Sequence, residues 1–318
     1  MGGRCLYRLG CVCLHRAQPV NENKYLHIER LWRGLVIGTP YLWLVLFFFV
    51  PIGFVFKISL ADPIIGQPPF TPLWEWTDSA RISILTTFDN YRFLFKEELY
   101  WISYLNSVKV ASISTLICLL VGYPMAYGIT RCSGNIKSFL LLLIVLPFWT
   151  SFLLRVYAWM GMLSTHGVIN TLLLNSGLIE QPLKLLYTDL AVYVGIVYTY
   201  LPFMILPLYA NLERRDLVLT EAAADLGSRP WRAFLDITLP LSTPGIIAGC
   251  LLVFIPALGE FVIPTLLGGL DSLMVGRTLF DEFFQNRDWP LASAVATLLL
   301  LILITPIMIF QKYREQER

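Results

Sequence analysis

Long apolar blocks dominate the chain, and a polar segment separates each block from the next. A helix that crosses the hydrocarbon core of a bilayer needs about 20 mostly apolar residues. Six blocks meet this requirement, at residues 34–60, 105–129, 139–163, 190–210, 246–267 and 291–310. The pattern therefore predicts an all-α membrane protein with six transmembrane helices.

Composition supports this interpretation. Apolar residues make up 56% of the chain and charged residues only 14%, whereas charged residues are about 25% of a typical soluble domain. The net charge of +2 is too small to favour nucleic-acid binding. The first apolar block is too long for the core of a signal peptide and no small-residue cleavage site follows it, so we expect it to be retained.

The distribution of Lys and Arg predicts the orientation. With the N-terminus inside, the cytosolic segments hold 15 basic residues and the outside segments six, while Lys57, Lys109 and Arg155 lie within spans. Both termini are therefore expected in the cytosol. The expected organisation is a cytosolic tail at 1–33, a first transmembrane helix at 34–60, an external loop at 61–104, a core of five transmembrane helices at 105–310 that includes a cytosolic loop at 211–245, and a cytosolic tail at 311–318.

Two of the polar segments contain local signals. In the N-terminal tail we expect a short interfacial helix at 25–32, and Cys5, Cys11 and Cys13 lie near His15 in a spacing that matches no recognised zinc site. Reduced cytosolic thiols are the simpler interpretation. In the external loop, prolines exclude a regular helix from the first half, and residues 88–95 read as a short amphipathic helix.

A polar stretch of twenty residues, 221–240, lies between the fourth and fifth spans. We expect a short helix at 216–226 that ends at Gly227, as helices often do at glycine. Ser228 and Pro230 suit the start of a second helix, which Pro240 would end. The result would be a helix–turn–helix elbow on the cytosolic side. It is either a docking surface or an elbow that only orients the adjoining spans.

Two charged residues lie near the middle of predicted spans: Arg155 in the third and Glu260 in the fifth. At a rise of 1.5 Å per residue, Arg155 lies about 6 Å and Glu260 about 4–5 Å outward of the span midpoints, so an ion pair is geometrically allowed. Intramembrane charges are costly and either pair with one another or face a water-filled path. Glu260 is thus either half of a structural pair or a carboxylate that faces a cationic substrate.

Aromatic residues crowd the third and fourth spans, and most of them should pack or anchor at the interface. Because aromatic faces attract ammonium groups, a few could contribute to a pathway with Glu260. The candidates are Trp149, Tyr157, Tyr198 and Phe261. Catalysis in the membrane is not expected, since the three histidines (His15, His27 and His166) all lie outside the spans and there is no metal-binding constellation.

The polar stretch matches a known pattern: Glu-Ala-Ala, three residues, Gly, nine residues, Ile-x-Leu-Pro. It resembles the EAA loop of type I bacterial ABC-importer permeases, which have the MetI-like fold. In that family the loop's first helix sits in a cleft of the ATP-binding subunit. The resemblance implies that the ATPase-coupling residues here are Glu221, Ala222, Ala223, Asp225, Gly227 and Arg229.

Further stretches, at 106–124, 146–159, 197–207, 259–269 and 286–290, look like the polyamine-importer permeases, most of all the putrescine permeases of Pot-type systems. The likeness covers about residues 34–310. It implies an inner-membrane subunit that passes putrescine or spermidine into the cytoplasm.

The implied partners are a second homologous permease, two copies of a cytosolic ABC ATPase and a periplasmic polyamine-binding protein. The chain contains no Gly-Lys dipeptide, hence no phosphate-binding P-loop, so it is expected not to be an enzyme. ATP and Mg would bind the partner ATPase, and this chain would carry no cofactor. The alternatives are an ABC permease for another small solute, such as a metal ion or amino acid, and a secondary transporter.

Overall fold

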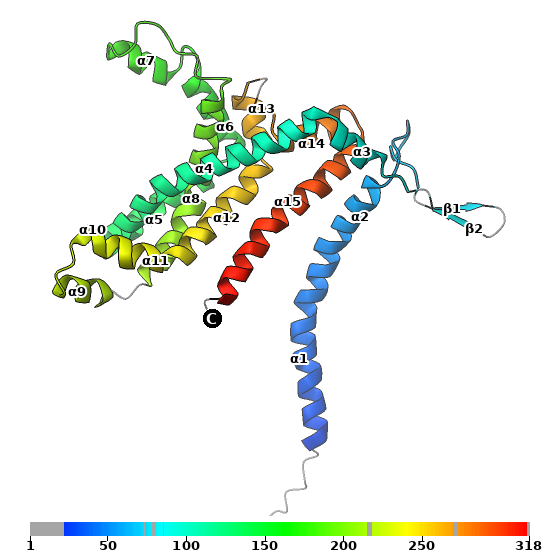
Figure 1. Ribbon diagram of the computed structural model, residues 1–318, viewed down its shortest axis with the longest axis horizontal. Coiled ribbons are helices and arrows are strands. Elements are labelled where there is room, and N and C mark those ends of the chain that lie inside the picture. Colours follow the sequence, from blue (N-terminus) through cyan, green and yellow to red (C-terminus); the bar gives the residue numbers. More distant parts are fainter. Residues whose placement is uncertain are drawn as a thin grey trace, which may run out of the picture. The chain divides into compact units, whose positions relative to one another are not determined.

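The computed structural model describes residues 22–72, 74–77, 81–84, 86–214, 218–269 and 272–316. The chain forms two compact units, Met1–Phe54 and Val55–Arg318. Apart from one small hairpin, the elements that Figure 1 labels are helices. Four described helices are long and apolar enough to cross a membrane, or six if each of two bent helix pairs counts as one span.

The described part of the first unit, from Glu22 to Phe54, belongs to one helical run that ends at Ser59. This run comprises α1 (Glu22–Leu44), a π-helical turn η1 (Val45–Phe49) and α2 (Val50–Ser59). Pro51 lies two residues after the π turn, and a proline has no N–H to continue the α-helical pattern. The expected separate helix at 25–32 does not form, because these residues belong to α1. The stretch Arg33–Ser59 is long and apolar enough to cross a membrane, with a mean hydropathy of 2.2.

The loop between α2 and α3 belongs to the second unit and contains the hairpin. Strands β1 (Trp74–Thr77) and β2 (Arg81–Ile84) pair antiparallel, with Trp74 opposite Ile84, so the all-α prediction misses one short sheet. The predicted short helix at 88–95 is confirmed as α3 (Asp89–Lys96). Asn90 fixes α3 to the end of α2, because its side-chain amide donates to the backbone oxygens of Ser59 (3.1 Å) and Ala61 (2.8 Å).

Three long helices form the centre of the second unit: α4 (Glu98–Thr130), α8 (Asp189–Glu213) and α12 (Thr243–Leu258). Each packs against the other two. Their shared buried cluster includes Cys118 from α4, Met204 from α8 and Val253 from α12, all fully buried. The last helix, α15 (Trp289–Gln316), contacts α12, α3 and α14 (Val275–Phe280). These helices correspond to the second, fourth, fifth and sixth expected spans.

Two expected spans are not single straight helices. The third is divided into α5 (Gly134–Val145), the 3-10 turn η2 (Leu146–Trp149) and α6 (Phe152–Leu163), and the axis bends by 93° at the break before continuing through α7 (Val168–Asn175). Pro147 lies in η2, where its missing N–H explains the loss of the α-helical pattern. The fifth ends at Leu258, and α13 (Val262–Leu267) begins only after a three-residue gap. This gap contains Glu260.

Candidate functional site

Glu260 lies in the break between α12 and α13 and is only 7% exposed. One carboxylate oxygen, Oε1, accepts hydrogen bonds from the backbone N–H groups of Val262 (3.0 Å) and Ile263 (3.4 Å). The other, Oε2, accepts from the hydroxyl of Tyr200 on α8 at 2.5 Å. The side chain thus satisfies free amides at the start of α13 and is held in one orientation by three donors.

Gly276 on α14 leaves room for the backbone of the break between α12 and α13. A side chain at Gly276 would place its Cβ 2.4 Å from the backbone oxygen of Gly259 and 2.7 Å from that of Glu260. Both distances are shorter than any ordinary contact of a Cβ atom. The backbone of the Glu260 segment therefore rests directly on α14, with no room for a larger residue.

Glu260 borders a cavity of about 520 Å³, which we call the Glu260 cavity. Its walls come from η2, α6, α8 and the end of α12. They combine one carboxylate, one guanidinium and several aromatic rings, from Phe148, Phe152, Arg155, Thr199, Tyr200, Phe203, Pro256, Gly259, Glu260, Phe261 and Val262. A carboxylate beside aromatic faces is a chemical environment that favours an organic cation.

Arg155 lines the same cavity, but it is not paired with Glu260 in this conformation. Within the described residues, ion pairs join Lys137 to Glu213 and Arg277 to Asp281. The guanidinium carbon of Arg155 instead lies 5.5 Å from the ring centre of Phe148 and 5.9 Å from that of Phe152. Its Nε and Nη1 atoms are buried without a hydrogen-bond partner in the described structure. The direct ion pair is absent here because the oxygens of Glu260 are directed to Tyr200 and the α13 amides.

The four candidate aromatic residues separate into two groups. Phe261 lines the Glu260 cavity as expected. Trp149 and Tyr157 are 78% and 53% exposed and are not among the described residues that line it. Tyr198 packs edge-on against Trp159 at 5.4 Å and borders a different cavity.

The residues that sequence reasoning missed as site residues are Tyr200, Phe148, Phe152 and Phe203. Phe152 precedes Arg155 by three positions and Phe148 by seven, a helical spacing that places residues on one face. That spacing could have indicated the two rings. No comparable signal existed for Tyr200, because its contact with Glu260 depends on where the fifth span breaks.

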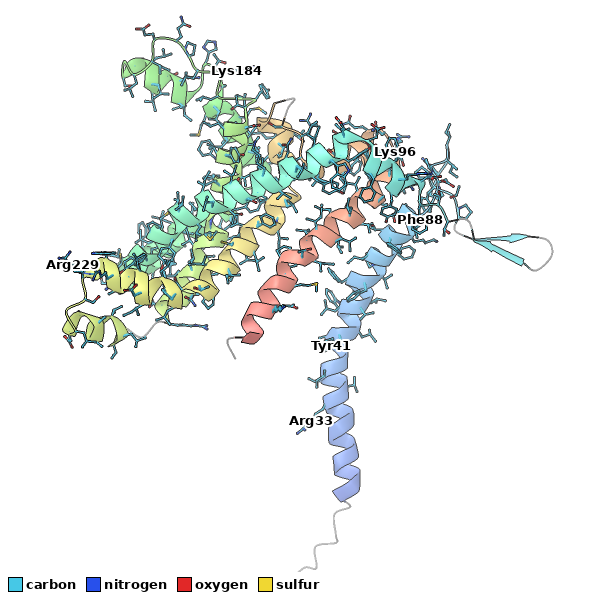
Figure 2. All side chains as sticks on the ribbon, viewed as in Figure 1. Arg33, Tyr41, Phe88, Lys96, Lys184 and Arg229 are labelled. Atoms are coloured by element: carbon cyan, nitrogen blue, oxygen red, sulfur yellow. The ribbon has the colours of Figure 1, made fainter. Side chains whose placement is uncertain are left out.

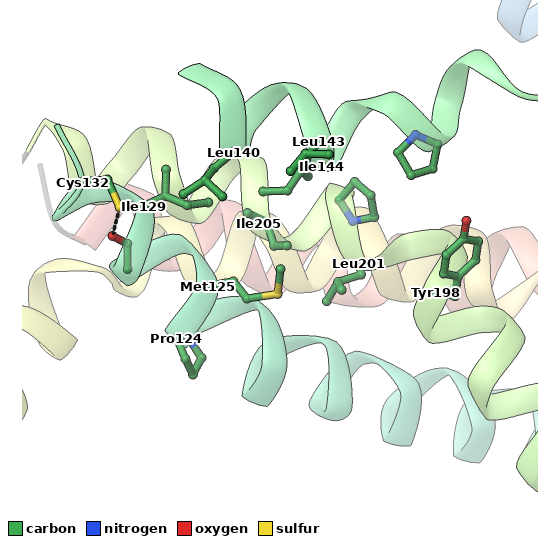
Figure 3. Close-up of a pocket in the computed structure, with 13 residues that line it drawn as sticks. Pro124, Met125, Ile129, Cys132, Leu140, Leu143, Ile144, Tyr198, Leu201 and Ile205 are labelled. Atoms are coloured by element: carbon green, nitrogen blue, oxygen red, sulfur yellow. Dashed lines mark hydrogen bonds between the residues drawn. The ribbon is translucent and has the colours of Figure 1, made fainter. Parts of the chain in front are cut away.

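The different cavity has a volume of about 550 Å³ and lies between α4, α5 and α8 (Figure 3). Leucine, isoleucine, methionine and proline dominate its wall, and Tyr198 and Cys132 are its only titratable residues. Burying an ammonium group in such a place without a compensating charge is unfavourable. Of the two cavities, the Glu260 cavity is therefore the one suited to a cation.

The polar stretch folds as a helical elbow, residues 218–241. Helix α9 (Val218–Asp225) ends at Gly227, whose φ of +80° is a conformation that favours glycine. The N–H groups of Gly227 and Ser228 donate to the carbonyls of Ala224 and Ala223, both at 2.9 Å, in a complete Schellman motif. The chain then turns through Arg229 (labelled in Figure 2) into α10 (Pro230–Ala233), with proline in its first turn.

The second half of the elbow is anchored to α4. The ring of Phe234 meets the rings of Tyr123 and Tyr127 edge-on, each at 5.7 Å. The expectation that Pro240 ends this helix is wrong. The helix continues through a π turn η3 (Phe234–Thr238) and α11 (Leu239–Leu241), and it bends by 62° into α12. The N–H groups in the first turn of a helix have no partner within that helix, so the N–H that Pro240 lacks is not needed there. Pro240 lies in the first turn of α11, and the chain therefore stays helical.

The outer surface of the elbow is exposed. Of the six residues implied in coupling, Ala223 is half-buried and the others are exposed: Glu221, Ala222, Asp225, Gly227 and Arg229. Leu226 and Trp231 are 89% and 55% exposed beside them. Large apolar side chains on an otherwise polar surface are typical of a protein contact. Five of the six implied residues are therefore accessible, and their role in coupling stays a prediction.

The region of the possible metal ligands Cys5, Cys11, Cys13 and His15 lies outside the described residues. Among the residues that the structure describes, no group of three or more His, Cys, Asp or Glu side chains could hold a metal ion.

Comparison with known proteins identifies the family. Residues 29–317 match the model of the family described as "Binding-protein-dependent transport system inner membrane component". The spermidine/putrescine transport system permease protein PotB of Haemophilus influenzae is 38% identical over 287 residues, which are 90% of this chain and 95% of that protein. PotB of Escherichia coli is 39% identical over 84% of this chain and 92% of its own length.

Solved structures show the same fold. A bacterial ABC transporter involved in the import of the acidic polysaccharide alginate aligns with a TM-score of 0.64 and is 17% identical. The alignment covers 91% of this chain and 99% of that chain. A second structure of a bacterial alginate ABC transporter, in complex with a pentasaccharide-bound periplasmic protein, aligns with a TM-score of 0.66. The chain is thus a multi-pass inner-membrane protein, and it belongs to the family of inner-membrane components of binding-protein-dependent transport systems.

Proposed function

We propose that this chain is a permease subunit of an ABC importer that moves polyamines, putrescine or spermidine, into the cytoplasm. Its relatives with that printed activity are 38–39% identical over most of both chains. The observation that carries the proposal in the structure is the Glu260 cavity, where a buried carboxylate lies among aromatic rings. A dication with a flexible apolar stem is complementary to such walls.

The topology completes this proposal. Each bent helix pair would count as one span, which gives six spans with both termini in the cytosol and the elbow on the same side. The elbow would dock in a cleft of the ATP-binding subunit through Glu221, Ala222, Ala223, Asp225, Gly227 and Arg229. The remaining partners would be a second homologous permease, another copy of the ATPase and a periplasmic polyamine-binding protein. ATP and Mg would bind the ATPase.

Cargo would meet Glu260 during passage. In the conformation described here, the carboxylate is held by Tyr200 and two amides while Arg155 has unpartnered donors in the same cavity. We infer that Glu260 pairs with Arg155 in a state without cargo and exchanges this partner for the ammonium group of the polyamine. The two alternatives left by the sequence would then be two states of one cycle.

Other cargo classes remain open to test within the same family. The molybdenum transport system permease ModB of Mycobacterium bovis is 30% identical over 64% of this chain. The described lining of the Glu260 cavity holds one carboxylate and one guanidinium, so its charge alone does not select the cargo. The polyamine proposal is supported instead by the aromatic rings around Glu260 and by the 38–39% identity to the PotB permeases.

The test is uptake into proteoliposomes that contain the complete transporter, with radiolabelled putrescine or spermidine outside and ATP inside. We expect uptake that requires both ATP and the binding protein. Uptake driven by an ion gradient without the ATPase would show a secondary transporter instead. Uptake of an amino acid or metal ion in preference to polyamines would show another cargo.

A further inference from the structure

Six aromatic rings form a continuous chain of contacts on one side of the Glu260 cavity. Successive ring centres lie 5.0, 4.7, 4.9, 4.9 and 6.3 Å apart. Two of the contacts are face-to-face, with interplanar angles of 12° and 7°. We call this set the aromatic ladder; in order it comprises Phe261, Phe280, Phe284, Phe283, Trp289 and Phe70.

The ladder begins at the cavity and ends in the external loop. Phe261 follows Glu260 in sequence and lines the Glu260 cavity. Phe280 closes α14, and the next two rings lie in the π turn η4 (Asp281–Gln285), three and four positions later on the same helical face. Trp289 starts α15, and Phe70 belongs to the loop between α2 and β1. The ladder thus joins two segments that are far apart in sequence to the residue beside Glu260.

Core packing does not account for these rings. Three buried apolar clusters occur in the described part of the second unit, and none of the six rings belongs to them or packs at their margins. Phe284 is 61% exposed and Phe261 38% exposed. The other four rings are half-buried. Phe261 and Phe284 are therefore the rings that offer most of their surface to a further molecule.

The charges around the ladder favour a cation. Asp281, Glu282 and Asp288 lie on or beside η4, against Arg277 and Arg287. Arg277 lies 3.9 Å from Asp281. Buried Glu282 accepts hydrogen bonds from Tyr100 and Asn286, both at 2.8 Å, and Asp288 accepts one from the Leu291 amide at 3.0 Å. Burial, reinforced by the nearby Glu282, raises the pKa of Asp288 above its usual range. An arriving cation would relieve the cost of the charged carboxylate.

We propose that the aromatic ladder is a binding track for alkylammonium cargo, which it delivers to Glu260. This inference rests on the proposed polyamine transport. Each ring accepts both parts of a polyamine, because its electron-rich face attracts the ammonium group and its apolar surface covers the methylene groups. Contacts of 4.7–6.3 Å between neighbouring rings allow the cargo to reach the next ring before it leaves the last.

The experiment measures equilibrium binding of radiolabelled spermidine to the purified complete transporter without binding protein, together with uptake in proteoliposomes. Leucine replaces the ring by an apolar side chain of similar bulk, so Phe284→Leu removes the π face and keeps the packing. We expect the Kd for spermidine to rise about two- to fivefold for Phe284→Leu, and about tenfold for Phe261→Leu combined with Phe284→Leu. Uptake at low spermidine should fall in parallel, while Phe284→Trp should bind at least as tightly as the wild type.

The matched control is Phe88→Leu. Phe88, labelled in Figure 2, is 69% exposed and contacts Tyr91 rather than the ladder. Its variant should bind spermidine like the wild type. An unchanged Kd for the double variant, or equal losses in the double variant and the control, would overturn the ladder. So would a Phe284→Leu complex that dissociates into its subunits, since the ring would then serve subunit packing. If the wild-type transporter binds and transports no polyamine, the proposed function itself is wrong.

Discussion

Glu260 is positioned by groups that no sequence pattern relates to it. A hydroxyl from α8 and two amides of α13 donate to its carboxylate, and Gly276 supplies the space for its backbone. The sequence indicated a functional or structural role for Glu260, because a charged side chain inside a membrane is energetically costly. It could not indicate the partners, since they depend on a break in the fifth span that Gly259 and Pro256 permit but do not locate.

At this scale the most informative variant is Tyr200→Phe. It removes one hydroxyl and leaves the Oε2 atom of buried Glu260 without its hydrogen bond. A buried acceptor left unsatisfied costs about 1–3 kcal/mol, so the melting temperature of the purified transporter should fall by several degrees. Tyr198→Phe is the control on the same helix, because phenylalanine keeps the ring contact with Trp159. Equal melting temperatures for the two variants would contradict the role given to Tyr200.

Gly276→Ala tests the contact between α14 and the Glu260 segment. A methyl group there would meet the backbone oxygens of Gly259 and Glu260, which cannot rotate away as a side chain can. We expect a loss of about 1–3 kcal/mol in stability, seen as a lower melting temperature, together with weaker spermidine binding. Gly161→Ala on α6 is the matched control, since nothing lies within 4 Å of a Cβ atom at that position. A Gly276→Ala protein that melts and binds like this control would show that the close approach is unimportant.

At the scale of elements, the elbow was the best predicted part of the chain. Its first helix, its glycine end and its proline start follow from local rules of helix capping, which act within a few residues. The continuation past Pro240 was missed, because it depends on Phe234 packing against Tyr123 and Tyr127 of α4. The break that holds Glu260 in the fifth span depends on tertiary contacts as well, whereas Pro147 marks the break in the third span. Prolines marked where breaks were allowed, but tertiary contacts chose among them.

Gly227→Ala tests the elbow as an element. At a φ of +80° an alanine is strained by roughly 1 kcal/mol, which weakens the Schellman motif that ends α9. We expect less ATPase subunit to co-purify with the permease, while the melting temperature of the membrane part stays within one or two degrees of the wild type. Gly134→Ala, at the helical start of α5 with open space around it, should retain the ATPase fully. Normal co-purification of both variants would mean that the shape of the elbow does not matter for docking.

At the scale of the whole molecule, the elbow, where the ATPase would act, and the Glu260 cavity, where cargo would pass, lie in different parts of the chain. Helix α11, the end of the elbow, adjoins one end of α12, and α13 follows the other end (Figure 1). Glu260 lies between α12 and α13. A rigid helix that connects two sites can transmit movement of one to the other. Six apolar blocks and the polar stretch predicted this division from sequence. The hairpin in the external loop and the size of the cavity could not be predicted, since neither has a periodic signal.

The most direct test of this account measures uptake and ATP hydrolysis in the same proteoliposomes, for the wild type, Glu221→Lys and Glu260→Gln. Gln removes the charge, keeps an acceptor for the α13 amides, and can donate its NH2 to the Tyr200 oxygen in place of the hydrogen bond that Glu260 accepts. Glu260→Gln should therefore hydrolyse ATP in response to binding protein while polyamine uptake falls at least tenfold. Glu221→Lys should lose both activities, because the docking surface is reversed in charge. Normal uptake by either variant, or loss of hydrolysis in Glu260→Gln with normal hydrolysis in Glu221→Lys, would contradict the account.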